Sequence, residues 1–80
     1  MPENDGDIER TVRQVIATTF RSATGSHPRL GEPPEWDSLG HMSLVAALED
    51  ALAVRFPTYV IAELTDVPAI VGAVRRLSAG

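Results

Sequence analysis

The amino-acid sequence predicts one all-α domain: a four-helix bundle with a short third helix and a long loop between the first two helices. Three observations lead to this prediction. Apolar residues recur in several stretches at the three- and four-residue spacings of amphipathic helices. A stretch rich in proline and glycine separates the first two of these, and nowhere does the chain alternate like a strand or repeat itself. With 80 residues, the range 1–80 is expected to form a single domain.

The first helix is expected to run to about Ser22. Asn4, Asp5 or Asp7 can cap its start, because a short polar side chain can accept from the unpaired amides of the first turn. One apolar stripe on this helix should face the core. Its members are Ile8, Val12, Val15, Ile16, Thr19 and Phe20.

The stretch from Ala23 to Trp36 is predicted to be a loop. It has no apolar period and few apolar residues, and it is interrupted by Gly25, Pro28, Gly31, Pro33 and Pro34. Loops of this length are uncommon in compact domains and call for a reason. Leu30 is expected to tuck back against the helices.

A second helix should begin at Ser38, and the rest of the chain is organised around it. Asp37 is a good N-cap, which makes Ser38 the first helical residue with its hydroxyl in solvent. One apolar stripe should face the core: Leu44, Val45, Leu48 and Leu52. A second, milder apolar strip starts beside the serine, and burial alone does not explain it: Leu39, Met42 and Ala46.

Two further helices are expected after Pro57, because proline disfavours a helical residue before it and can itself begin a helix. The short third helix should run from Thr58 to Leu64. Thr65 or Asp66 should cap the last helix, with Pro68 in its first turn. The apolar contacts of these two helices are Val60, Ile61, Leu64, Val67, Ile70, Val71, Val74 and Leu77.

Composition narrows the possible functions. Eleven acidic residues against seven basic ones give a net charge of −4, and this argues against nucleic acid as a partner, because a phosphate backbone needs a basic face. The absence of cysteine excludes disulfides and thiolate metal sites, and two distant histidines do not make a metal site. No signal peptide and no apolar run of membrane-spanning length is found. We expect a cytoplasmic monomer, complete as it stands, although an excised module given a start codon would look the same.

At Ser38 the sequence resembles the acyl carrier proteins. Asp37-Ser38-Leu39 is similar to the Asp-Ser-Leu attachment motif of that family, and the run from Leu44 to Glu49 is similar to its second helix. The tripeptide alone is a weak signal; the helix behind it and the chain length strengthen it, and the resemblance covers most of the chain. It implies that 4'-phosphopantetheine from coenzyme A is attached to Ser38, and that the thiol of this arm carries acyl groups as thioesters.

The resemblance also implies a carrier without catalysis of its own. Its partners would be a phosphopantetheinyl transferase and acyl-loading or acyl-processing enzymes of ligase, acyltransferase or ketosynthase type. Such partners should bind weakly, so that each is left quickly. The residues expected to meet them are Asp37, Leu39, Met42, Ala46, Glu49 and Asp50.

Some positions depart from the family pattern. Gly40 and Ser43 occupy outward positions where carriers of fatty acid synthesis commonly have acids, which favours a specialised carrier in a polyketide-like or other natural-product pathway. Trp36 replaces a small residue or glycine; we expect it to pack over the loop as filler, the alternative being that its edge contacts the arm or a partner enzyme. His41 could act as a base near Ser38, but without a third group to orient it a solvated position is the better interpretation.

Two alternatives stay open. An unmodified helical adaptor for other proteins would need only the amphipathic helices. A discrete carrier loaded with an amino or hydroxy acid would use the same serine. A small serine hydrolase is disfavoured, because the chain has no Gly-x-Ser-x-Gly elbow and no oriented histidine, and can hardly enclose a pocket.

Overall fold

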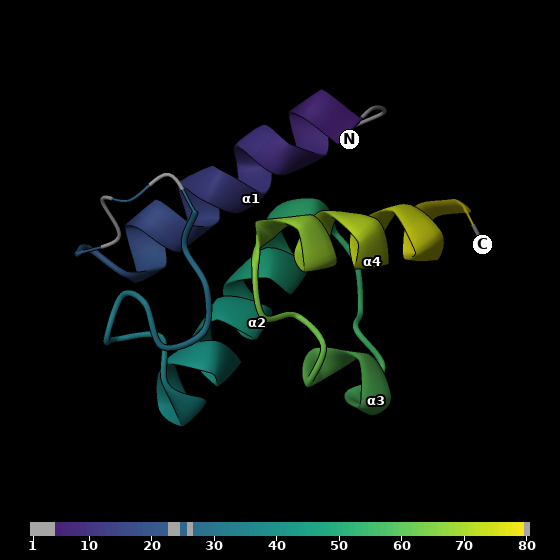
Figure 1. Cartoon of the computed structure of the whole chain (residues 1–80). Coiled ribbons are helices and arrows are strands. Elements are labelled where there is room, and N and C mark those ends of the chain that lie inside the picture. Colours follow the sequence, from purple (N-terminus) through teal and green to yellow (C-terminus); the bar gives the residue numbers. More distant parts are fainter. Residues whose placement is uncertain (1–4, 23–24, 26, 80) are drawn as a thin grey trace.

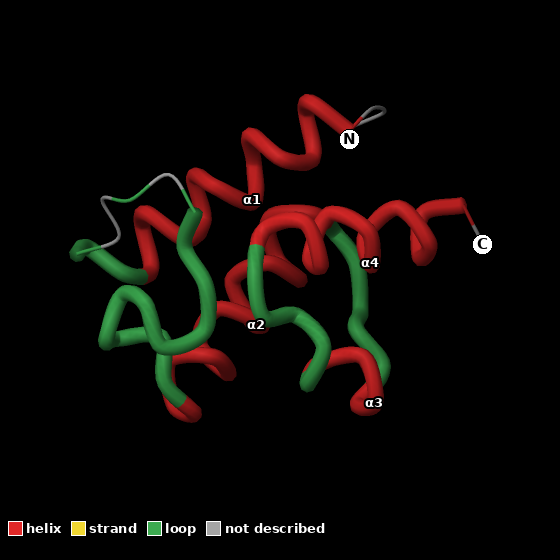
Figure 2. Tube along the Cα trace, in the orientation of Figure 1, coloured by secondary structure: helices red, strands yellow, loops and turns green. Residues whose placement is uncertain are grey.

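Four helices and no strands make up the described part of the chain, which comprises residues 5–22, 25 and 27–79 of this computed structural model. The helices are α1 (Asp5–Thr19), α2 (Ser38–Leu52), α3 (Thr58–Ile61) and α4 (Val67–Ala79). Helix α1 contacts both α2 and α4, and the short α3 lies apart from α1 (Figure 1). A long connection joins α1 to α2 (Figure 2). Asn4, one of the three expected caps of α1, lies outside the described residues.

The apolar stripes predicted for the three longer helices form the core between them. Half-buried side chains pack at its edge, among them Val15, Ile61, Val71 and Leu77. The fully or almost fully buried apolar side chains are Ile8, Val12, Ile16, Phe20, Trp36, Leu44, Val45, Leu48, Leu52, Phe56, Val60, Leu64, Val67, Ile70, Ala73 and Val74.

Helix α1 is shorter than predicted, ending at Thr19 rather than at Ser22. A last helical bond runs from the amide of Phe20 to the carbonyl of Ile16 at 2.8 Å. The hydroxyl of Ser22 then donates to the carboxylate of Glu35, and the Ser22 amide does so at 3.3 Å. The residues just after α1 are therefore bonded to Glu35, near the end of the loop.

This tie depends on the charge of Glu35. The Ser22 hydroxyl, followed by the backbone amides of Glu35 and Ser22, lowers the pKa of the Glu35 carboxyl below its ordinary value. A depressed pKa in the folded protein means that the charge of Glu35 adds stability at neutral pH, and that this part is lost as the pH falls through that pKa.

Helix α3 also ends early, at Ile61 rather than at Leu64. Beyond it, the amides of Glu63 and Leu64 bond carbonyls three residues back, those of Val60 at 2.8 Å and Ile61 at 3.2 Å. Such bonds are typical of tight turns rather than of an α-helix. Leu64 is nevertheless fully buried, so the predicted apolar contact exists although the helix does not reach it.

The connection between α1 and α2 is held by backbone bonds to the segment before α4. The amide of Leu30 donates to the carbonyl of Thr65 at 2.8 Å, and the backbones of Arg29 and Glu32 bond each other. The side chain of Leu30 is 46% exposed, so the prediction that it tucks back against the helices was wrong. Asp66 caps α4 as expected, accepting the amide three residues on at 2.9 Å.

Candidate functional site

Ser38 stands where the sequence predicts it, as the first residue of α2. Asp37 precedes it in an extended conformation, with φ −107° and ψ −164°, and its carboxylate accepts the amide of Gly40 at 2.9 Å. Asp37 and Ser38 are both exposed. The serine is therefore reachable from solvent, at the end of a 15-residue helix where unpaired amides and the helix dipole favour an anion.

Exposed apolar side chains occur close to Ser38 in the sequence and on α3. Leu39 is 82% exposed and Met42 is 53% exposed, which agrees with a second strip on α2 that burial does not explain. On α3, Tyr59 is 77% exposed. Sequence reasoning did not single out Tyr59, because a helix of four residues carries too short a pattern to show which of its faces is open.

An apolar hollow of about 450 Å³ opens beside Ser38. It lies between the loop, the first turns of α2, and α3. Its lining residues are Leu30, Ser38, His41, Met42, Thr58, Ile61 and Ala62. The hollow brings Ser38 and Met42 together with residues of the loop and of α3 that the sequence did not connect with the site.

The remaining residues of the expected partner surface lie further along α2. Ala46 and Asp50 are exposed, whereas Glu49 is half-buried. The carboxylate of Glu49 accepts the amide of Phe56 at 2.9 Å, so it holds the connection that follows α2. Asp50 therefore presents its charge at the surface, while Glu49 has a structural role in addition to any contact with a partner.

Gly40 does not point outward, and that prediction was wrong. A Cβ atom on Gly40 would lie 2.0 Å from the carbonyl oxygen of Glu35 and 2.9 Å from Cε1 of Phe20. The first turn of α2 thus packs directly against the backbone of the preceding loop, which only a residue without a side chain allows. Ser43, the other departure from the family pattern, is exposed as expected.

His41 is buried, with 9% of its area exposed, so the predicted solvated position was also wrong. Its Nδ1 accepts the indole N–H of Trp36 at 2.9 Å. In the neutral ring the proton is then on Nε2, which donates to the carbonyl of Ile61 at 2.8 Å. Because both nitrogens are engaged, His41 is not placed to take a proton from Ser38.

Trp36 is the filler that the first of its two interpretations predicts, since it is fully buried. Its ring stacks on Phe20, with centroids 5.6 Å apart and planes 22° apart. Its ring plane is inclined by 16° to that of His41, to which its N–H donates. Contact of its edge with an arm or a partner is incompatible with this burial. We call Phe20, Trp36 and His41 the ring cluster.

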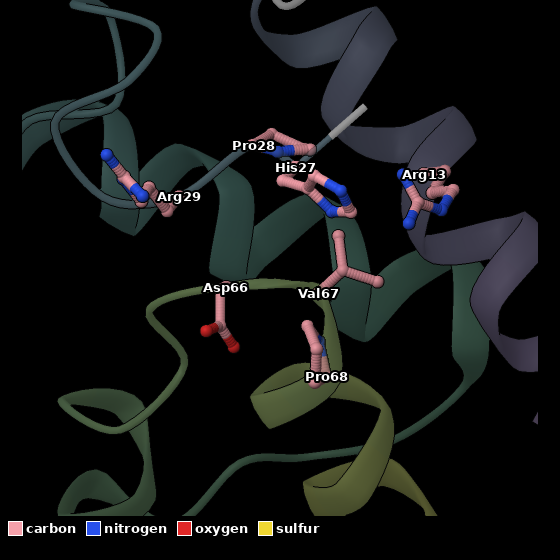
Figure 3. Close-up of a pocket in the computed structure, with 7 residues that line it drawn as sticks. All are labelled: Arg13, His27, Pro28, Arg29, Asp66, Val67 and Pro68. Carbon is pink, nitrogen blue, oxygen red and sulfur yellow. The ribbon is translucent and has the colours of Figure 1, made fainter. Parts of the chain in front are cut away.

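A second hollow, of about 270 Å³, lies between α1, the loop and the start of α4 (Figure 3). Three basic residues line it, Arg13, His27 and Arg29, which suggests an anion site, but the acidic Asp66 lines it as well. Figure 3 shows Arg13 and Arg29 on opposite sides of His27, however, and they do not converge. Arg13 pairs with Glu9 at 2.8 Å and Arg29 pairs with Glu32 at 3.0 Å, so neighbouring acids already balance these charges.

Other kinds of site find little support in the residues that the structure describes. No three His, Cys, Asp or Glu side chains gather there as metal ligands. None of the helices described is both long enough and apolar enough to cross a bilayer.

Models of known protein families, curated proteins and solved structures were compared with the chain, and none matches. Ser38 and its surroundings are therefore the candidate functional site.

Proposed function

We propose that this protein is a carrier of the acyl carrier protein type, with 4'-phosphopantetheine on Ser38 and acyl groups carried as thioesters on that arm. The observation that supports it is an exposed serine, capped by Asp37 at the head of α2, beside an apolar hollow. The resemblance of Asp37-Ser38-Leu39 to the attachment motif adds the chemistry. On this proposal the four helices, the long first connection and the short α3 form the bundle of that family.

The head of α2 suits a permanent anion. A phosphodiester there would be stabilised by roughly 0.3–1 kcal/mol at an exposed position. Unlike phosphoserine, it has no second ionisation near neutrality, so its charge would stay constant around pH 7. In the attachment reaction the Ser38 oxygen would form the new bond to phosphorus while the pyrophosphate bond of coenzyme A breaks and adenosine 3',5'-bisphosphate leaves. The Ser38 proton would pass to a base of the transferase, because both nitrogens of His41 are engaged.

The exposed residues of α2 also support a proposal for the pathway and the partners. Outward-facing Ser43, where carriers of fatty acid synthesis commonly have an acid, favours a polyketide-like or other natural-product pathway in the cytoplasm. The transferase and the acyl-loading and acyl-processing enzymes would contact the monomeric carrier through exposed residues at the start of α2 and along it, and Tyr59 of α3 is a further exposed candidate. They are the cap Asp37 and, within α2, Leu39, Met42, Ala46 and Asp50.

The decisive experiment incubates the purified protein with coenzyme A, magnesium and a promiscuous phosphopantetheinyl transferase, and then weighs the intact chain. We expect a gain of one phosphopantetheine that is absent in Ser38→Ala. Ser43→Ala is the matched control, because Ser43 is an exposed serine of the same helix, and it should gain the arm like the wild type. An unchanged wild-type mass, with a transferase that modifies another carrier, contradicts the proposal and favours a helical adaptor. Ester hydrolysis by the unmodified protein would instead indicate an enzyme.

The acidic part of the partner surface gives a second prediction. Asp50→Arg should slow arm attachment at low salt by roughly threefold or more and should lose most of this effect at high salt, because exposed charges act mainly on the rate of encounter. Glu49→Gln is the comparison, since it removes one charge but keeps an oxygen that can accept the Phe56 amide. Rates at low salt that are equal for Asp50→Arg and wild type would remove Asp50 from the partner surface.

A further inference from the structure

The hollow beside Ser38 has an apolar wall that arm attachment itself does not explain. Leu30, Met42, Ile61 and Ala62 supply this wall, and Thr58 lies with Ser38 in the lining. Its volume of about 450 Å³ is within the range of small-molecule sites. Because the hollow adjoins the attachment residue, a flexible arm that folds back on itself can bring its cargo there. The walls favour an apolar cargo.

The side chain of His41 lies between this hollow and Trp36 of the ring cluster. Its ring belongs both to the lining of the hollow and to the ring cluster, and with 9% exposed only an edge of it reaches the hollow. Directly behind it lies Trp36, which is fully buried. The bond from Nε2 to the carbonyl of Ile61 carries the same ring across from α2 to α3.

An apolar chain that entered the interior from this hollow toward Trp36 would have to displace this ring. The indole N–H of Trp36 and the carbonyl of Ile61 would then lose the partners that they have at 2.9 and 2.8 Å. A hydrocarbon cannot replace either bond, and buried polar groups without partners are strongly unfavourable. The hydrogen bonds at both ring nitrogens thus hold His41 in place.

We propose that the hollow is the seat of a short acyl group, and that His41 determines this specificity by closing the interior to longer chains. The inference depends on the proposed function, because cargo reaches the hollow from an arm on Ser38. His41 acts here as a positioning residue: it takes no part in acyl transfer. A longer chain would leave the hollow and extend into solvent or into a partner enzyme.

The closure can be tested with Trp36, the one tryptophan of the chain, as a reporter. The transferase attaches arms that carry either a dodecanoyl group or a dodecanoyl group with a terminal bromine, which quenches indole fluorescence on contact. In the wild type, we expect the two loaded forms to emit equally. In His41→Ala the brominated form should lose emission relative to the plain one, and the dodecanoyl form should melt at a higher temperature than the same variant with an empty arm.

A second variant distinguishes the opening of the interior from a general loss of stability. His41→Gln can still accept from Trp36 and donate to Ile61 through its amide, so it should behave like the wild type. Quenching in the wild type overturns the inference whether or not His41→Ala folds. An unchanged mass after incubation with the transferase would instead overturn the proposed function, and the inference with it.

The seat for short cargo has its own test, the spontaneous hydrolysis of a butyryl thioester. On the protein the thioester should hydrolyse more slowly than on free pantetheine, and Ala62→Glu, which places a charge in the wall of the hollow, should abolish this protection. Ala17→Glu is the matched control, because Ala17 is an exposed alanine of α1 outside both the lining and the partner surface, and it should keep the protection. Equal hydrolysis on wild type and on free pantetheine would refute the seat.

Discussion

Replacement of Gly40 by alanine is expected to destabilise the protein by about 2 kcal/mol or more, because the added Cβ would meet atoms that cannot move cheaply. The nearest, 2.0 Å away, is the carbonyl oxygen of Glu35, which is backbone, and Cε1 of the buried Phe20 follows at 2.9 Å. Relief requires moving either the loop or the first turn of α2. Both movements would disturb the cap that Asp37 places on the Gly40 amide and would thus also slow arm attachment to Ser38.

Gly72 in α4 provides the matched control. The nearest atom to a Cβ there is Nη1 of Arg76 at 3.9 Å, the end of a flexible side chain. Gly72→Ala should therefore stabilise the protein by up to about 1 kcal/mol, the usual advantage of alanine over glycine within a helix. Urea unfolding followed by circular dichroism measures both changes. Equal stabilities for the two variants would contradict the close contact of the loop with α2.

The local rules of helix formation predicted much of this molecule. Asp37 and Asp66 cap the helices where short polar side chains precede an apolar period, and both bonds measure 2.9 Å. The core residues of α2 are the predicted stripe from Leu44 to Leu52. In these cases the cause lies within one turn of the residue concerned, so the sequence was sufficient.

The errors arise where the cause lies in a distant segment. Nothing near Gly40 indicates that the ring of Phe20, at the end of α1, packs against the first turn of α2. Nor does the sequence around Leu30 indicate that its amide pairs with Thr65. His41 is different, because the signal was present: it lies three residues before Leu44 and therefore on the buried stripe. Its polarity led to a solvated interpretation, although Trp36 supplies one partner for a buried imidazole.

The same distinction applies to the candidate site. The position of Ser38 and its exposure follow from the cap and the helix start, both of which are local. The hollow beside it is built from the loop, α2 and α3, and no pattern within any one of them predicts it. The position and exposure of Ser38 could thus be predicted from the sequence, whereas the hollow beside it depends on tertiary packing.

Trp36→Ala is expected to have the largest effect on stability, a loss of about 3–5 kcal/mol, as is usual when a buried aromatic side chain is removed. For a chain of this length the total stability is on the order of 4–12 kcal/mol. The substitution would leave Phe20 without its stacking partner and Nδ1 of His41 without a donor. Thermal and urea unfolding should therefore show a protein close to the limit of folding.

Two further variants identify the cause of this loss. Trp36→Phe keeps an aromatic ring against Phe20 but removes the N–H, so it should cost about 1–3 kcal/mol, the penalty for an unsatisfied buried acceptor on His41. Tyr59→Ala removes an aromatic side chain that is 77% exposed and should change stability by no more than about 0.5 kcal/mol. If Trp36→Ala lost no more than Tyr59→Ala, the ring cluster could not be holding the loop against α2. With the ring cluster intact, Asp37 and Ser38 follow directly from a fixed residue, which keeps the serine at the head of the helix.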